Sequence, residues 1–327
     1  MLLCYALVDL TPARRCQPLH TPGGWSLGTV AHIMSGRCHD AHTGGCRMQI
    51  MPIACHAWAY NNLPLDEAVG TIARLGFRWV DLGSGPHLDF NRVAADPAGE
   101  AAAILSQLRR FDLAISDLYL MLPHTNAPDP AQREAQLAMF ERLIPFAVAL
   151  GTPGITVSPG IVHADGPDHS LARAVPALLR MLQAAEDTDL RVSFEPHMDS
   201  VAQRPEQALL LLEAVPGLSV TLDYAHFLYQ GIVSREIAPL LEHVAHVHIR
   251  QARRGALQTA HNEGTLNIPQ LLQDLHNAGY RGALTVEYMT TFGWHHMQAI
   301  SISNETVRTR DALRAARARL LAPSRPR

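Results

Sequence analysis

Lysine is absent from this chain, and all 27 of its lysine-plus-arginine residues are arginine. Lysine supplies the Schiff-base amine of class I aldolases, anchors pyridoxal phosphate, and binds phosphate in the P-loop motif, so these three chemistries are excluded. Arginine stays protonated at neutral pH, which suits it to binding anions or sugar oxygens rather than to moving protons. The arginines are therefore candidates for anchoring a ligand.

Long apolar runs and a strong excess of charge are also missing. The chain has no run of 18 apolar residues, so the sequence predicts no membrane span. The net charge is −3, without a basic stripe in the body of the chain, which argues against nucleic acid as the main partner. The sequence leaves open whether the chain forms a homo-oligomer.

Cysteine does not occur beyond residue 55. Most of the chain therefore contains no disulfide, as expected in a reducing cytoplasm, and the N-terminus lacks the basic segment of a signal peptide. We accordingly expect a cytoplasmic protein. The cysteines are Cys4, Cys16, Cys38, Cys46 and Cys55.

Residues 1–47 show no sustained helical or strand periodicity, and the pairs Gly23-Gly24 and Gly44-Gly45 interrupt every candidate element. We predict that this segment is a disordered extension or results from a start codon assigned too far upstream, so that the working protein begins near Met48. Four cysteines and histidines near the end of the segment could suggest a zinc site, but their spacing does not match the usual zinc motifs. They are Cys38, His39, His42 and Cys46.

From Met48 onward, short apolar runs alternate with segments of helical period. This alternation is typical of β-α units, and it predicts a single-domain (β/α)8 TIM barrel over residues 48–321 with a C-terminal tail at 322–327. An open doubly wound sheet would normally carry a glycine-rich turn after its first strand, and none follows the run at 48–55. The eight predicted strands end near His56, Leu82, Leu118, Val157, Glu195, Asp223, His248 and Glu287.

The helical segments carry apolar stripes and recognisable ends. Gly76 and Gly279 are expected to cap two of them, Pro205 to begin a third, and a last helix is expected at about 304–321. Pro145 and Pro176 lie inside helical patterns, so we predict that these helices are kinked or shorter than their patterns. The apolar stripes that define three helices are Leu65, Val69, Ile72 and Leu75; Leu137, Phe140, Ile144 and Val148; and Ile268, Leu271, Leu272 and Leu275.

The last four predicted strands each end in an acidic or imidazole side chain. In a closed parallel barrel the C-terminal ends of all strands meet at one mouth, where barrel enzymes keep their chemistry. Two glutamates, an aspartate and a histidine that converge there make a hard, oxygen-rich site for one divalent metal ion. The predicted ligands are Glu195, Asp223, His248 and Glu287.

Between Met48 and Leu321 the chain resembles the sugar phosphate isomerase/epimerase family of xylose isomerase-like TIM barrels. Each motif is weak alone, but their order and spacing together are fairly specific. The motifs that carry the resemblance are Phe194-Glu195-Pro196-His197, Leu222-Asp223-Tyr224-Ala225-His226, His246-Val247-His248-Ile249-Arg250, Glu263-Gly264-Thr265-Leu266-Asn267, Gly279-Tyr280-Arg281-Gly282 and Val286-Glu287-Tyr288.

The resemblance implies an isomerase or epimerase of a small carbohydrate. In ketose epimerase-like members the four strand-end residues bind a divalent metal, often manganese, although magnesium, cobalt or zinc remain possible. By position, His226 and Arg254 would contact substrate. A metal that chelates a ketone and its neighbouring hydroxyl makes the adjacent C–H more acidic, and Glu195 and Glu287 would then remove and return the proton through an enediolate.

Several nearby residues allow two interpretations. His246 shares a strand face with His248 and is expected to be a core residue or to support that ligand. His197 and His56 are candidate substrate contacts, although a loop contact or a packed rim explains them equally well. Arg250 and Arg253 are predicted to lie on the surface. Trp294, His295 and His296 form either a lid or an exposed loop.

The metal site alone leaves other reactions open. Lyases of the same barrel group, which act as dehydratases or cleave C-glycosides, begin with the same proton removal. A non-catalytic barrel that binds a sugar or a partner protein is a further alternative. Tri-zinc nucleases of the group carry an Asp-x-His pair after the metal histidine, whereas this chain has His261-Asn262-Glu263, which argues against DNA repair. The absence of a glycine-rich phosphate loop favours an unphosphorylated substrate.

Overall fold

The computed structural model describes residues 50–322. The predictions made for residues 1–47, including the cysteines and histidines there, lie outside the described residues, as does nearly all of the predicted tail. Within the described part of the chain, no helix is long and apolar enough to cross a membrane.

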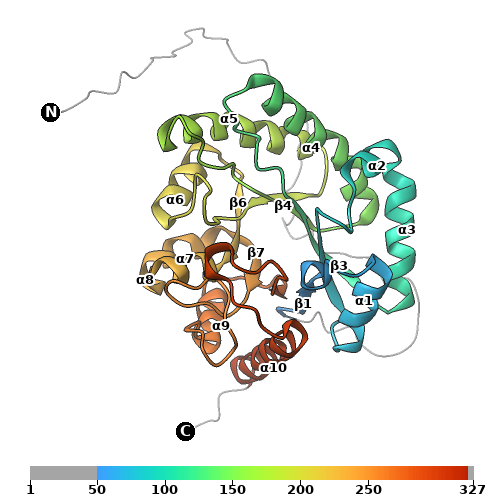
Figure 1. Ribbon diagram of the computed structural model, residues 1–327, viewed down its shortest axis with the longest axis vertical. Helices are drawn as coiled ribbons and strands as arrows, with labels where there is room; N and C mark the ends of the chain where they lie inside the picture. The colour runs from blue at the N-terminus through green and yellow to red at the C-terminus, as the bar shows by residue number, and fades with distance from the viewer. Residues whose placement is uncertain (1–49, 323–327) are drawn as a thin grey trace, which may run out of the picture. The chain divides into compact units, whose positions relative to one another are not determined.

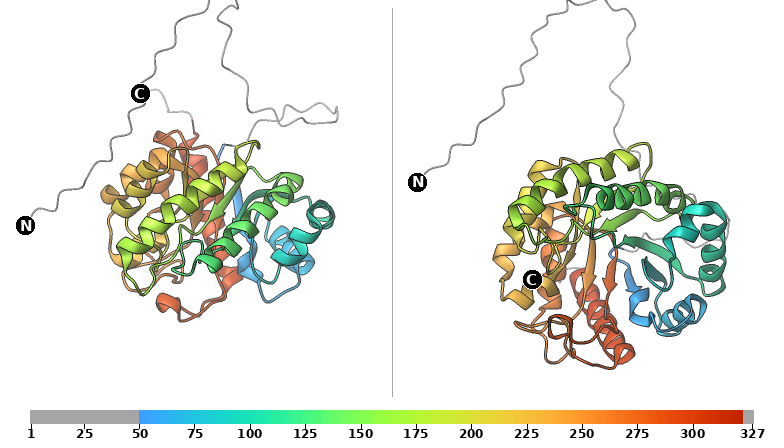
Figure 2. Two further views of the ribbon diagram at one scale, coloured as in Figure 1. Left: turned by 90° about the horizontal axis from the view of Figure 1, so that it is seen from above. Right: turned by 45° about the horizontal axis from the view of Figure 1, so that its top comes forward.

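Eight parallel strands close into a barrel in the order of the sequence, with β1 paired to β8. Helices surround the strands on the outside, as Figures 1 and 2 show. The predicted (β/α)8 barrel is confirmed. The strands are β1 (Ile53–His56), β2 (Trp79–Gly83), β3 (Ala114–Leu120), β4 (Gly154–Val157), β5 (Arg191–Phe194), β6 (Ser219–Asp223), β7 (Val244–Ile249) and β8 (Leu284–Val286).

The segments between and after the strands contain the helices, most of which bury one face against the barrel, whereas η3 (Trp294–His296) has no buried residue. The helices are η1 (Ala57–Tyr60), α1 (Leu65–Arg74), α2 (Phe90–Ala95), α3 (Pro97–Arg110), α4 (Pro130–Leu150), α5 (Pro167–Ala185), α6 (Pro205–Ala214), α7 (Tyr224–Gln230), α8 (Ser234–Ile237), η2 (Ala238–His243), α9 (Ile268–Asn277), η3 (Trp294–His296) and α10 (Ile302–Leu320).

The first strand is shorter than predicted. The apolar run begins at Met48, but β1 begins at Ile53. Met51 has a positive φ of 52°, and Pro52 has no backbone N–H to donate to a neighbouring strand. These two residues therefore turn the chain before the strand can start.

Several predicted helix ends are confirmed, and one prediction about proline is partly wrong. Gly76 follows α1 with a φ of 84°, a left-handed conformation that glycine adopts without strain, and Pro205 begins α6. However, α4 continues through Pro145 and α5 through Pro176, so neither helix ends early. Both prolines are exposed, and the buried stripes of α4 and α5 hold these helices in place. Val148 is 51% exposed and does not belong to the stripe predicted for α4.

Candidate metal centre and cavity

Four side chains stand where the last four strands reach the C-terminal mouth of the barrel. Glu195 follows β5, and Asp223 is the last residue of β6. His248 lies one residue before the end of β7, and Glu287 follows β8. All four side chains are almost completely buried. The barrel thus brings the four predicted ligands to one mouth.

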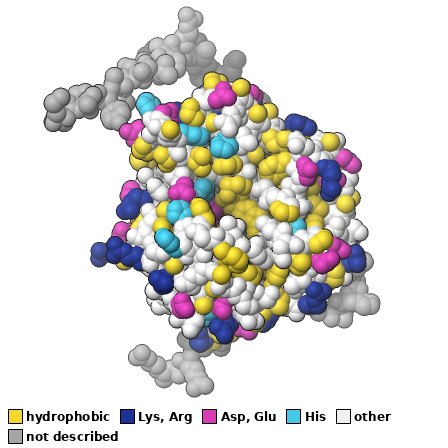
Figure 3. Space-filling model, viewed as in Figure 1, with side chains coloured by type: hydrophobic (Ala, Val, Ile, Leu, Met, Phe, Trp, Pro, Cys, Tyr) yellow, Lys and Arg dark blue, Asp and Glu magenta, His cyan; other side chains and the backbone are white. Residues whose placement is uncertain are grey.

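A cavity of about 360 Å³ opens at this mouth. Figure 3 shows a hollow at the centre of this face, with hydrophobic side chains around it. Polar groups of the site form part of its wall, and tryptophans and methionines form much of the rest. The lining residues are Trp58, Asn61, Ser84, Met121, Ile161, Glu195, His197, Met198, Asp199, His226, Arg250, Glu287, Met289, Thr291 and Trp294.

The potential ligand atoms fall into three groups, of which one, Asp81, His246 and His248, lies deeper in the barrel and two adjacent ones lie at the mouth. In one of the two at the mouth, an atom each of Glu195, Asp223 and His226 lies within 4.8 Å of the others, and His56, His248 and Glu287 form the second. These two groups are joined through His248, whose Nδ1 lies 2.7 Å from Glu195 Oε1 and 3.7 Å from Glu287 Oε2. His226 and His56, predicted as substrate contacts, are therefore close enough to act as ligands as well.

Arg250 corrects the prediction of a surface arginine. Its side chain is 1% exposed and lies at the site itself. Its Nη2 is 2.7 Å from Asp223 Oδ2, and its Nη1 is 3.0 Å from Glu287 Oε2. This burial could not be predicted from the sequence, because Arg250 directly follows the apolar end of a strand and precedes another polar residue, Gln251.

The pKa values of the site reflect carboxylates that are crowded together and buried. Burial and the neighbouring carboxylates raise the pKa of Glu287 to about 8, and burial raises the pKa of Asp223. The pKa of Glu195 is lowered despite burial, because His248 hydrogen-bonds to it. Burial alone would lower the pKa of His248, but Glu287, Asp81 and Glu195 raise it well above its usual value. Three carboxylates thus face one guanidinium and one imidazole.

This donor set fits a divalent cation. Carboxylate oxygens and an imidazole nitrogen are ligands that manganese and magnesium accept, and a double positive charge would offset the repulsion among the three carboxylates. The Oδ2 of Asp223 is also buried without a hydrogen bond, although it lies near Arg250.

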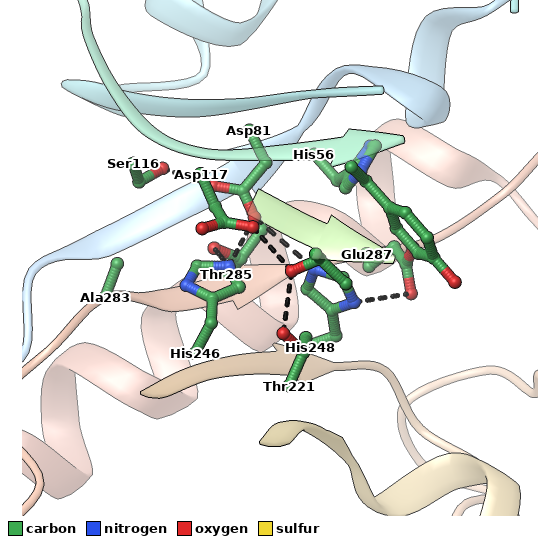
Figure 4. Close-up of polar contacts among 12 residues, drawn as sticks. His56, Asp81, Ser116, Asp117, Thr221, His246, His248, Ala283, Thr285 and Glu287 are labelled. Atoms are coloured by element: carbon green, nitrogen blue, oxygen red, sulfur yellow. Dashed lines mark hydrogen bonds and ion pairs between the residues drawn. The ribbon is translucent and has the colours of Figure 1, made fainter. Parts of the chain in front are cut away.

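A pair of buried side chains inside the barrel supports His248 from behind. Asp81, in β2, places its Oδ2 2.6 Å from His246 Nε2 and 3.4 Å from His248 Nε2 (Figure 4). Ser116 donates a further hydrogen bond to Asp81. The two imidazoles hold the pKa of Asp81 well below its usual value, although burial acts in the opposite direction. His246 therefore lies behind the ligand, as expected, and Asp81 is a member of the site that the sequence did not reveal.

Aromatic side chains form one wall of the site. Tyr119, near the end of β3, donates a hydrogen bond of 2.9 Å to Glu195 Oε2, a role that the sequence did not reveal. His56 packs on Trp58 with ring centroids 4.3 Å apart and accepts a hydrogen bond from the Trp58 backbone at Nδ1. Burial lowers the pKa of His56 to about 3, so its ring is neutral.

The other predicted substrate contacts differ in their placement. His197 and His226 line the cavity, and His197 Nε2 lies 2.8 Å from Ser158 Oγ. Trp294 also lines the cavity, with its ring centroid 6.2 Å from that of His226. His56 is not a lining residue.

Arg254 lies outside the cavity, contrary to what the resemblance implied. The chain turns back between Arg253 and Ala256, which exchange two backbone hydrogen bonds, and Gly255 has a φ of 74°. This turn leaves Arg254 exposed, with its side chain against Gly231. The arginine that the fold brings to the site is Arg250 instead.

The comparison with family models decides the classification. Residues 69–317 match the model of the xylose isomerase-like TIM barrel. The chain belongs to that family. No curated protein matches the sequence significantly.

Solved structures of this barrel family share the fold at low sequence identity. D-Psicose 3-epimerase from Clostridium cellulolyticum H10, solved with D-tagatose, superposes with a TM-score of 0.66 at 14% identity, over 81% of this chain and 99% of its own. The 3-keto-D-glucoside 4-epimerase from E. coli gives 0.62 at 16% identity, over 81% and 99%. A xylose isomerase-like TIM barrel protein from Mycobacterium smegmatis, in complex with magnesium, gives 0.64 at 17% identity, over 83% and 98%.

Proposed function

We propose that this protein is a divalent-metal-dependent isomerase or epimerase of an unphosphorylated keto-sugar or polyol-derived substrate. The observation that carries the proposal is that three carboxylates and an imidazole lie buried together at the barrel mouth, where Glu195 and Glu287 line the cavity and His248 Nδ1 lies 2.7 Å from Glu195 Oε1 and 3.7 Å from Glu287 Oε2. The family of the chain and the sugar epimerases among its structural neighbours support it.

Glu195, Asp223, His248 and Glu287 would hold the metal; the donor set is hard and rich in oxygen, and the resemblance to ketose epimerase-like barrels favours manganese. When bound, a divalent ion polarises a substrate carbonyl and makes the neighbouring C–H more acidic. His248 Nδ1 faces Glu195 and is the nitrogen placed to bind, because Asp81 lies on the side of Nε2.

The proton transfers would fall to Glu195 and Glu287. These residues follow β5 and β8, three strands apart around the barrel, and both line the cavity. Two carboxylates placed in this way can approach a substrate carbon from different sides, one removing the proton and the other returning it through an enediolate. Tyr119 orients Glu195 by its hydrogen bond to Oε2.

The cavity wall favours a substrate without phosphate. Among the described residues, Arg250 is the one basic side chain other than histidine that lines the cavity. Its guanidinium already forms ion pairs with Asp223 and Glu287. Trp58 and Trp294 offer flat apolar faces of the kind that pack against the C–H face of a sugar ring.

A test of this function is proton exchange at the carbon next to the substrate carbonyl. We expect the manganese-loaded protein to incorporate solvent deuterium into a member of a keto-sugar panel, followed by NMR. Glu287→Gln should slow exchange about 10²- to 10⁴-fold, because one acid-base group is lost. Glu186→Gln, at an exposed position, is the control and should exchange at the wild-type rate. A lack of exchange on the whole panel would favour a binding barrel and contradict the proposal.

A lyase is the second candidate, and the apolar part of the cavity favours it. Met121, Met198 and Trp294 can accommodate an aglycone beside the sugar. The same exchange experiment separates the two reactions by product mass. An epimer keeps the mass of the substrate apart from deuterium, whereas a dehydratase loses water and a C-glycoside lyase releases the aglycone.

A further inference from the structure

Arg250 already occupies a cation position at the proposed metal centre. It follows the last residue of β7, and its side chain is 1% exposed. One guanidinium pairs with two of the four proposed ligands, Asp223 at 2.7 Å and Glu287 at 3.0 Å. A positive charge so close to these oxygens disfavours a second cation on the same carboxylates.

The guanidinium is held less well than these ion pairs suggest. Its Nε is buried without a hydrogen-bond partner, which carries a desolvation cost. The contact with Asp223 Oδ2, although short, lacks the angles of a hydrogen bond, since Oδ2 is among the buried oxygens without one.

The contact between Arg250 and His226 brings two hydrogen-bond donors together. His226 Nδ1 lies 3.1 Å from the backbone nitrogen of Met198 and accepts its hydrogen. A neutral imidazole that accepts at one nitrogen carries its proton on the other. His226 Nε2 therefore bears a hydrogen and faces Arg250 Nη2, also a donor, at 3.1 Å. Two donors face each other there, which favours departure of the guanidinium when another cation can take the carboxylates.

We propose that Arg250 is an internal counter-ion that competes with the divalent metal for Asp223 and Glu287, and so sets the metal affinity of the site. The inference rests on the proposed function, because it assumes the same metal centre. Without metal, the guanidinium pairs with both of these buried side chains. When metal binds, it leaves them, and because Arg250 lines the cavity it moves toward the space where a substrate would lie.

The test measures metal affinity in the full-length protein after treatment with chelator. Calorimetric titration with Mn²⁺ would compare the wild type with Arg250→Met, which keeps an unbranched apolar stem but removes the charge. We expect the variant to bind Mn²⁺ about tenfold or more tightly, since removal of a nearby like charge favours the cation. Arg253→Met, at an exposed position of the same loop, is the matched control and should leave the affinity unchanged.

A second measurement does not depend on the folding of the variant. Crystal structures of the wild type with and without Mn²⁺ should show that the guanidinium has moved out of hydrogen-bonding distance of Asp223 and Glu287 when the ion is present. Equal affinity of the wild type and Arg250→Met, or a bound ion with both ion pairs intact, would overturn the competition and leave the metal centre standing. Failure of all three proteins to bind Mn²⁺ would overturn both.

Discussion

At the scale of single residues, the two nitrogens of His248 face different partners. Nδ1 faces Glu195, and Nε2 faces Asp81. A carboxylate behind a metal-binding imidazole fixes its tautomer and orientation and makes the ring a better ligand. Asp81 in turn is held by His246 and Ser116. The geometry of the mouth therefore depends on side chains one layer below it.

Asp81→Asn should weaken metal binding. An amide keeps the shape of the side chain but loses the charge that holds Nε2–H, so we expect the affinity for Mn²⁺ to fall about 10- to 100-fold. Calorimetric titration measures this change, with Asp187→Asn, at an exposed position, as the control. Wild-type affinity in Asp81→Asn would show that the orientation of His248 does not depend on this carboxylate.

Cys55 should be inert in the folded protein. It is fully buried in β1, and burial raises the pKa of its thiol, so the reactive thiolate is scarce at pH 8. Iodoacetamide should alkylate Cys55 at least about tenfold more slowly in native protein than in urea. Mass spectrometry of the peptide that contains Cys55 measures both rates, and equal rates would mean that the strand opens readily.

Site residues at the ends of strands could be predicted from the sequence. Site residues inside strands, and the burial of Arg250, could not. Glu195 and Glu287 are visible because a charged residue follows an apolar run directly. Asp81 and Tyr119 lie within strands, where nothing in a single sequence tells which side chains meet across the barrel. The burial of Arg250 depends on Asp223 and Glu287, which are distant in the chain.

At the scale of elements, helix positions follow from apolar periodicity, but helix breaks do not follow from proline alone. Buried residues of α4 lie on both sides of Pro145, with Phe140 and Ile144 before it and Ala147 and Leu150 after it. Their packing keeps α4 continuous over 21 residues. Strand β1 shows the opposite case, because local geometry at Met51 and Pro52 overrides an apolar run. Tertiary packing thus decides which local signals prevail.

Pro145→Ala should stabilise the protein. The proline is exposed inside α4, where it removes a backbone donor, and alanine restores the hydrogen bond. We expect a gain of about 1–2 kcal/mol, less than the full helix-propensity difference of about 3 kcal/mol, because alanine also loosens the unfolded chain. Urea unfolding measures the gain. Pro130→Ala, at the first turn of the same helix, is the control with little expected effect. A lower midpoint for Pro145→Ala would contradict the account.

At the scale of the whole molecule, the barrel closes within its own residues. The first strand pairs with the last, and α10 contacts both β1 and β8. The order of eight strands and the (β/α)8 architecture were predictable from the alternation of patterns alone, because each unit repeats the same physical rule. The cavity was not predictable from the sequence, because its walls come from loops that follow many different strands.

A protein that begins at Met48 should fold and bind metal as the full chain does. All the proposed ligands, and all the strands in the part of the chain that the structure describes, lie beyond that residue. We expect melting temperatures within about 2 °C, since the change in unfolding free energy should be small, and equal affinities for Mn²⁺. Differential scanning calorimetry and titration compare the two proteins. A substantially lower melting temperature for the shorter protein would show that residues 1–47 contribute to the fold.

The proposed function depends on one divalent metal ion at the barrel mouth. Elemental analysis of protein purified without chelator would test this for the wild type and Glu287→Gln, before and after addition of manganese. We expect about one ion per wild-type chain and a lower occupancy in the variant, because one of the proposed ligands has lost its charge. No bound metal in the wild type, even after manganese is added, would contradict the proposed function.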